Sequence, residues 1–322
     1  MITLKEFRLA VTISAYLAIC TLSGAMSLNA SAQQIPVRSN YLMSTLMDHP
    51  AAAGNRECVD MRLGNRNQWV GMPGGPTNSF ISITGRVSED DNVAQGFAGR
   101  VETDQAGAWG TTSFSLAYSH KIQLRHSRWL SAGFALGVTQ HRLNTADLEF
   151  PEFSTSSDPA VLGSTQFLFP TVDAGIWYQD RKNFGGITLI NATSASLSEI
   201  ALNTTSTRHV VITAGSSMEL EGKFMFRPST NIRFAGGLPP SFEINGSVVY
   251  DDAVAVGLGY RSQSEVVGQV QFAVMDYVKI GYSYGFGISA IRTVAPNSHE
   301  ITLALSSCNT GPSRGVKCSA YD

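Results

Sequence analysis

The strongest constraint on the fold is an alternation of apolar side chains with small or polar ones, at a period of two residues. It is clearest near the C-terminus, in residues 253–261, 277–286 and 300–305. A β-strand points successive side chains to opposite faces, so this period predicts strands with one apolar face. A helix would need apolar residues three and four positions apart, and no long helical pattern follows residue 32.

The pattern starts with a hairpin over residues 58–88. Its first strand contains Asn-Arg-Asn-Gln-Trp-Val-Gly at 65–71, and the chain turns at the Pro- and Gly-rich stretch 72–76 before it returns. Alternation on both sides of such a turn predicts a β-hairpin. About fourteen runs of this kind follow one another, most of them near the ~9–11 residues with which a tilted strand crosses a bilayer.

The connections between the predicted strands fall into two groups by length. The sequence indicates tight turns at 89–92, 180–182, 251–252 and 276. It indicates long connections at 143–164, 195–206 and 287–297. Counting strands puts the two groups at opposite ends, as in bacterial barrels with short periplasmic turns and long extracellular loops. A soluble sandwich has no reason to sort its connections in this way. The predicted fold is therefore all-β, an antiparallel transmembrane β-barrel of about 14 strands.

The N-terminus has the features of an export signal. Lys5 and Arg8 precede a mostly apolar run at 9–22, and Ala30-Ser31-Ala32 offers a cleavage site of small residues. The alternative, a transmembrane helix, fits less well because the apolar run is short. Residues 1–32 are therefore expected to be a signal peptide that exports the protein to the cell outer membrane.

These boundaries divide the chain into four parts: a signal peptide (1–32), a periplasmic N-terminal segment (33–57), an outer-membrane β-barrel (58–306) and a C-terminal tail (307–322). The sequence leaves open whether residues 33–57 fold under the barrel, enter its lumen or wait for a partner.

Three of the four cysteines, Cys58, Cys308 and Cys318, would remain after cleavage of the signal. Cys308 and Cys318 are close enough in sequence to close a short loop with a disulfide, which an envelope compartment permits. Free thiols in the tail are the alternative. The Cys and His spacings match no metal site, and no cofactor is expected.

Charge and hydropathy exclude some classes of function. The chain carries 23 Lys+Arg and 25 Asp+Glu, a net charge of -2, which gives no case for nucleic-acid binding. The mean hydropathy of +0.01 is too polar for a helical membrane protein. It is ordinary for a barrel, in which only every second residue of a strand faces lipid.

The inward parity of the predicted strands collects charges of both signs, for example at Arg66, Arg100, Asp173, Arg233 and Glu300. Opposite charges in this set can pair across a crowded lumen. Channels usually select with rings of a single sign, so the mixture favours a plugged interior over a selective channel.

No reaction is indicated by the sequence. The histidines are scattered, and the chain contains no nucleophile elbow or recognisable triad order. The adjacent carboxylates at 90–91 and 251–252 lie in predicted turns, where Asp side chains satisfy the backbone. The protein is therefore expected not to be an enzyme.

Four motifs, in this order, resemble the PorP/SprF family of Bacteroidota type IX secretion and gliding proteins. They are YLMSTLMDHPAAAGN, NRNQWVG, GGPTNSFISI and NSHEITLAL. The residues that match the family pattern are Tyr41, Met43, Pro50, Ala51, Ala53, Gly54, Arg66, Gln68, Trp69, Val70, Gly71, Pro76, Thr77, His299 and Glu300. The chain departs from the pattern at His49, Ala52 and Asn65, where the family prefers Asn, Tyr and Tyr. These changes are typical of a divergent member.

The resemblance implies an outer-membrane barrel that docks to periplasmic components of type IX secretion, or that holds the C-terminal domain of a secreted adhesin. An outer-membrane channel or porin-like transporter is the alternative. The partners expected are therefore type IX components or the adhesin domain, with outer-membrane lipid around the barrel and no nucleic acid.

The family motifs also suggest where the functional residues lie. Partner binding is expected at Tyr41, Met43, Pro50 and Gly54. A lumenal network, where the first strand closes the barrel against the last, is expected to contain Arg66, Gln68, Trp69, His299 and Glu300.

Overall fold

The computed structural model describes residues 35–90, 92–125, 127–144, 165–193 and 206–307. Within them the chain forms a single antiparallel sheet that closes on itself. The predicted signal peptide, 1–32, and the predicted disulfide partners Cys308 and Cys318 lie outside the described residues.

The wall of the barrel is a series of neighbouring strands. In chain order they are β1 (Asp60–Val70), β2 (Thr77–Asp90), β3 (Val93–Ala106), β4 (Trp109–Arg125), β5 (Arg128–Leu143), β6 (Thr165–Gln179), β7 (Asn183–Ile190), β8 (His209–Ser216), β9 (Met218–Glu219), β10 (Phe224–Ala235), β11 (Ser241–Tyr250), β12 (Val254–Arg261), β13 (Glu265–Met275), β14 (Val278–Gly287) and β15 (Asn297–Ser306). β8 and β9 are separated by Ser217 alone and both pair with β10, so together they fill one position in the wall. The described chain therefore forms a barrel of 14 strands, which confirms the predicted fold class.

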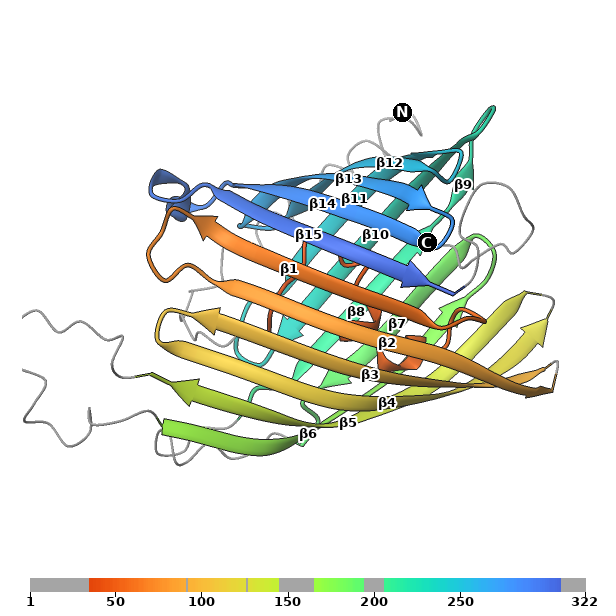
Figure 1. Cartoon of the computed structure of the whole chain (residues 1–322), viewed down its shortest axis with the longest axis horizontal. Helices are drawn as coiled ribbons and strands as arrows, with labels where there is room; N and C mark the ends of the chain where they lie inside the picture. Colours follow the sequence, from red (N-terminus) through yellow and green to blue (C-terminus); the bar gives the residue numbers. More distant parts are fainter. Residues whose placement is uncertain (1–34, 91, 126, 145–164, 194–205, 308–322) are drawn as a thin grey trace, which may run out of the picture.

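The barrel closes where its first strand meets its last. β1 pairs with both β2 and β15, and Figure 1 shows the orange β1 beside the blue β15. In the register of this seam, Asp60 lies opposite Ser306 and Arg66 lies opposite Glu300. The prediction that the first strand closes against residues 301–305 is confirmed.

The two ends of the barrel differ in their connections. The end where β1 begins, called the short-turn end below, carries the connections that follow β2, β4, β6, β9, β11 and β13. The opposite end, called the long-loop end, carries the three longest connections of the barrel, which follow β5, β7 and β14. The predicted sorting of turns and loops is therefore correct. Short turns face the periplasm in bacterial barrels.

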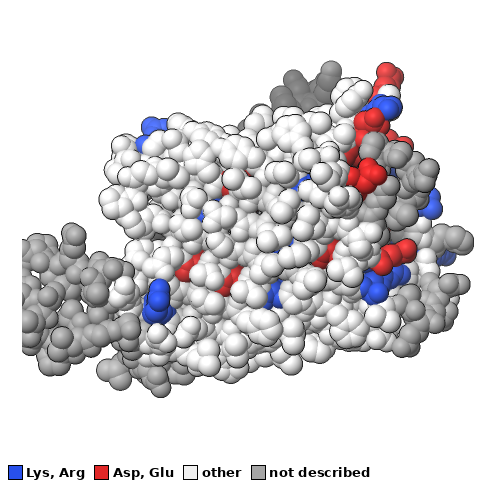
Figure 2. All heavy atoms as spheres, viewed as in Figure 1, with Lys and Arg blue, Asp and Glu red and all other residues white. Residues whose placement is uncertain are grey.

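The two faces of the wall differ in polarity. On β12, Val256 and Leu258 are exposed on the outer face, whereas Ala255 and Gly257, which alternate with them, are buried. The outer face shown in Figure 2 is largely uncharged, and its most prominent group of charged side chains lies at the right, toward the short-turn end. An apolar outer face in contact with lipid and a polar inner face are typical of a transmembrane barrel.

Helical structure in the described residues is limited to three short turns. They are α2 (Thr45–Asp48), η1 (Pro50–Ala52) and η4 (Ala290–Thr293). No helix in the described part of the chain is long and apolar enough to cross a membrane.

Candidate functional site

The lumen of the barrel is occupied by the chain that precedes β1. Residues 36–56, called the plug below, contain α2 and η1 and lie enclosed by the strands (Figure 1). From Arg38 to Arg56, every residue except Leu42 is buried. The segment predicted as periplasmic, 33–57, therefore lies in the lumen from Arg38 to Arg56.

This location changes the role of the first family motif. Tyr41, Met43, Pro50 and Gly54 are all buried, so they present no exposed surface in this structure. Partner binding at these four residues stays a prediction. The physical reason for their burial is the polar inner wall, which supplies hydrogen-bond partners for backbone and side-chain groups of the plug. The Tyr41 hydroxyl, for example, donates a hydrogen bond of 2.8 Å to the Ser229 hydroxyl of β10.

The plug runs through the lumen from the long-loop end to the short-turn end. Near the long-loop end, the Arg233 guanidinium donates to the carbonyl of Pro36 at 3.3 Å. Near the short-turn end, Gln179, the last residue of β6, donates to the carbonyl of Asn55 at 3.4 Å. The chain then enters β1 at Asp60.

Ion pairs hold the middle of the plug. The carboxylate of Asp48 in α2 lies between the guanidinium groups of Arg38 and Arg233, and its distance to the Arg233 nitrogen is 2.7 Å. Arg38 also pairs with Glu102 of β3. All these side chains except that of Glu102 are at most 9% exposed. One plug carboxylate thus connects the plug to β10, and one plug arginine connects it to the distant β3.

A second ionic cluster joins the plug to the closing seam. The backbone N–H groups of Ser39 and Asn40 donate to the carboxylate of Glu300 on β15. The Arg66 guanidinium on β1 donates to the Ser39 hydroxyl at 2.6 Å and pairs with Glu265 of β13 at 2.7 Å. Its distance to the Glu300 carboxylate is 3.8 Å. The seam and the plug therefore share one buried network.

The predicted network at the seam is only partly what the structure contains. Arg66 and Glu300 are inside it, as expected. His299 is on the outer side, where its Nδ1 atom lies 2.7 Å from the Tyr282 hydroxyl. Trp69 lies at a break in the β1–β15 register with a φ of 57°, and the Gln68 N–H bonds the Pro76 carbonyl at 2.8 Å. The break in register shows why strict parity does not extend to the end of β1.

Close packing explains the small residues of the motif. A Cβ atom added to Gly96 of β3 would stand 2.0 Å from the Ala53 carbonyl oxygen, far inside a van der Waals contact. Gly54 has a φ of +64°, which favours glycine, and a Cβ there would meet the Gly96 Cα at 2.7 Å. The plug and β3 can approach this closely only because glycine occupies both positions.

Several lumenal residues support the plug without having been singled out from the sequence. The two ring nitrogens of His49 lie 2.8 Å from the hydroxyls of Thr188 and Thr213. Lys121 of β4 donates to the Asn55 side chain and to the Ala51 carbonyl. Thr188, Thr213 and Lys121 belong to the inward parity of β7, β8 and β4, which is the signal that could have found them.

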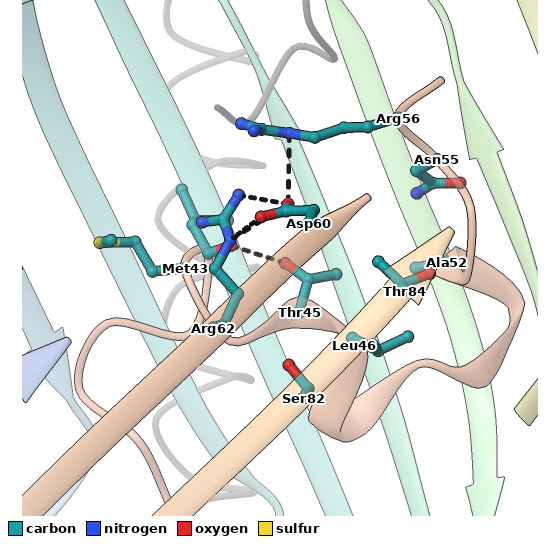
Figure 3. A pocket seen from close by; sticks show the side chains of 11 residues that line it. Met43, Thr45, Leu46, Ala52, Asn55, Arg56, Asp60, Arg62, Ser82 and Thr84 are labelled. Carbon is teal, nitrogen blue, oxygen red and sulfur yellow. Dashed lines mark hydrogen bonds and ion pairs between the residues drawn. The ribbon is translucent and has the colours of Figure 1, made fainter. Parts of the chain in front are cut away.

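A small cavity remains between the plug and the wall at the short-turn end (Figure 3). Its volume is about 40 Å³, which is enough for a few water molecules. Asp60 in its lining pairs with Arg62 at 2.8 Å and with Arg56 at 3.4 Å. In the described residues no group of three or more His, Cys, Asp or Glu side chains could hold a metal ion. The lining of the cavity therefore offers polar contacts, among them the Asp60–Arg62 pair.

Cys58, between the plug and β1, is disulfide-bonded. Its sulfur lies 3.5 Å from the Ser306 hydroxyl at the end of β15. The predicted pair, Cys308 and Cys318, falls outside the described residues.

The comparisons with solved structures find other outer-membrane barrels. A Pseudomonas aeruginosa FadL homologue is 9% identical with a TM-score of 0.47, covering 87% of this chain and 100% of that one. The CymD monoaromatic hydrocarbon channel is 12% identical with a TM-score of 0.49, covering 86% and 94%. BamA from Haemophilus ducreyi, without POTRA domains 1–3, is 10% identical with a TM-score of 0.42, covering 78% and 70%. These likenesses concern the fold alone.

A comparison with curated proteins finds no sequence match. The family comparison matches residues 30–305 to the description "Type IX secretion system membrane protein PorP/SprF". The match includes the plug and the whole wall except Ser306, the last residue of β15. The chain belongs to the PorP/SprF family of type IX secretion system membrane proteins.

Proposed function

We propose that this protein is a plugged, non-enzymatic outer-membrane scaffold of the type IX secretion and gliding machinery. In this role it docks periplasmic components of the machinery or anchors the C-terminal domain of a secreted adhesin. We also propose that residues 1–32 export it as a signal peptide. The family and the barrel fold support an outer-membrane location.

The observation that carries the proposal is the plug. It contacts opposite parts of the wall, because Arg38 reaches Glu102 of β3 while Asp48 reaches Arg233 of β10. Charges that would otherwise line a pore are paired with one another or with backbone carbonyls. Arg100, for example, donates to the carbonyls of Leu46 and Met47 and pairs with Asp173 at 2.8 Å.

The contacts of the plug also favour the barrel ends as the docking surfaces. Polar groups of the motif at Tyr41–Gly54 are bonded to the inner wall, so a partner cannot contact them without displacing the plug. The short turns are available to periplasmic partners and the long loops to partners at the cell surface. Under this proposal the family motif supports the barrel from within, and the exposed ends carry specificity.

Gene deletion with complementation tests the scaffold role. In the deletion strain, a particular cargo or adhesin should be trapped inside the cell or missing from the cell surface. Unrelated outer-membrane proteins should stay at normal levels. Complementation with the full chain should restore display. Unchanged secretion, adhesion and gliding in the deletion strain would overturn the proposal.

An outer-membrane channel is the alternative. Its test is the conductance of the purified protein in planar bilayers, compared with an open porin reconstituted at the same protein-to-lipid ratio. A scaffold should show little conductance. Steady, porin-like current through the wild-type barrel would favour the channel.

A further inference from the structure

The hairpin formed by β9 and β10 continues at the short-turn end after its neighbour β7 has ended. The pairing of β7 with β8 stops at Asn183 and Ser216, and the next residue, Ser217, donates its N–H to the Lys182 carbonyl at 2.6 Å. Beyond this point β9 pairs with β10 alone. Figure 1 shows the hairpin projecting at the upper right of the barrel. In the part of the chain that the structure describes, the other side of β9 is a free edge.

The backbone of Glu219 faces this free edge. In an antiparallel ladder, every second residue of a strand bonds to the same neighbour. The Leu220 N–H donates to the Phe224 carbonyl of β10 at 2.9 Å, whereas the Ser217 N–H donates to the opposite side. Glu219 follows Ser217 by two positions, so its N–H and C=O groups point away from β10. An added strand can pair with these groups.

The side chains along the edge give it two different faces. Met218 and Leu220 are 49% and 50% exposed. Glu219 between them points to the opposite face of the strand, and Glu221 follows it at the turn. Both glutamates are exposed. An extended segment placed along β9 therefore meets apolar side chains on one face and carboxylates on the other.

The charge of the edge restricts what can bind there. Glu219 and Glu221 form no ion pair with any residue described in the structure, and Lys223 beside them pairs with Asp251 of the next turn at 2.6 Å. Two copies of this edge would bring like charges together, and like charges that face each other across a ladder are destabilising. A segment with basic side chains is complementary.

We propose that the free edge of β9 docks an extended segment of a periplasmic partner, which adds to the sheet as one more strand in line with β7. The segment alternates basic side chains, facing Glu219 and Glu221, with apolar side chains beside Met218 and Leu220. In strand addition, main-chain hydrogen bonds contribute affinity and alternate side chains contribute specificity. The inference rests on the proposed scaffold function, in which the short-turn end meets periplasmic components.

Peptide binding to protein purified from outer membranes, in detergent micelles at physiological salt, tests the proposal. The probe is a short fluorescent peptide that alternates Lys with Val. The control peptide has the same composition, with all Lys residues before all Val residues. Fluorescence anisotropy should show at least about tenfold tighter binding of the alternating peptide, because only a period of two puts all its basic side chains on one face. Equal affinities, or no binding of the alternating peptide, would overturn the proposal.

Charge reversal provides the matched variants. Glu219→Lys/Glu221→Lys should weaken binding of the alternating peptide by at least about tenfold, because repulsion replaces attraction. Glu57→Lys/Asp276→Lys makes the same change in net charge on other connections of the short-turn end. It should weaken binding by less than about threefold, because salt screens distant charges. Equal losses in the two variants would indicate general attraction of cations and would contradict docking at β9.

Amide hydrogen exchange separates strand addition from attraction between charges. The alternating peptide should slow exchange of the Glu219 N–H in the wild type, because that group faces the edge and gains a main-chain partner. The control peptide should leave its exchange rate unchanged. Absence of added protection at Glu219, or equal protection by both peptides, would also overturn the proposal.

These measurements are separable from the test of the scaffold role by gene deletion. If deletion removes a cargo from the cell surface but the alternating peptide is not preferred, the docking edge is wrong and the scaffold role stands. If deletion changes nothing but the peptide binds and protects Glu219 as expected, the strand-binding edge stands and the scaffold role fails.

Discussion

Asp48 of the plug and Arg233 of β10 form a buried ion pair with a nitrogen–oxygen distance of 2.7 Å. The same carboxylate pairs with Arg38, which in turn pairs with Glu102 across the lumen. A carboxylate shared by two buried guanidinium groups anchors the plug more firmly than any single surface contact could. Removing it would leave Arg38 with Glu102 alone and would take the Asp48 carboxylate away from Arg233.

We expect Asp48→Asn to lower the free energy of unfolding by about 3 kcal/mol, at the low end of the range for breaking a buried pair. The low end applies because Arg38 retains Glu102. Urea unfolding of the barrel in detergent micelles or vesicles measures the change. The control is Asp251→Asn, which breaks an exposed pair with Lys223 and should cost less than about 1 kcal/mol. Equal effects of the two variants would show that Asp48 is not an anchor.

Gly96→Ala should destabilise the protein by about 1–3 kcal/mol, the usual cost of overpacking. The added methyl group would overlap the Ala53 carbonyl, so the plug must shift away from β3. The matched control is Gly99→Ala on the same strand, where the nearest side-chain atoms lie at 3.7 and 3.8 Å. Comparison of the two unfolding temperatures checks the prediction, and a harmless Gly96→Ala would mean that the plug does not press on β3.

Arg66→Met and Glu265→Gln should be non-additive. Their side chains form a buried pair at 2.7 Å, and contacting pairs usually couple by about 0.5–3 kcal/mol. A double-mutant cycle of unfolding free energies measures this coupling. The control cycle combines Arg66→Met with Asp173→Asn, whose partner is Arg100, and should be additive within about 0.5 kcal/mol. Additivity in both cycles would place Arg66 outside the seam network.

Loosening the plug should increase ion conductance in planar bilayers. The double variant Asp48→Asn/Arg100→Gln removes the shared carboxylate and the guanidinium that binds the Leu46 and Met47 carbonyls. We expect frequent open events from this variant and few from the wild type or from Asp251→Asn. Identical conductance in all three proteins would indicate that the plug does not block a path.

The strand pattern could be predicted because each wall residue has only two environments. Leu258 faces outward and Arg261 inward, and the period of two assigns both sides without any knowledge of distant contacts. The meeting of the first and last strands could also be predicted, because a membrane barrel has to close. Arg66 and Glu300 were therefore placed correctly.

His299 was misplaced because the family motif, and not the period of two, assigned it to the lumenal network beside Glu300. It lies opposite Asn67 in the ladder, and both belong to the outer parity. The register break between Asn67 and Val70 is a local backbone feature that periodicity does not predict.

The amino-acid sequence by itself thus determined the family, the barrel and the polarity of its two faces, because these follow from local period and motif order. Only the tertiary structure decided where residues 36–56 lie. They have no strand or long helical period, and their partners, such as Arg233 and Glu300, come from strands almost two hundred residues or more away along the chain. A buried motif and an exposed one look alike until those strands surround it. The polar lumen, assembled from many strands at once, is what places Tyr41–Gly54 inside the barrel.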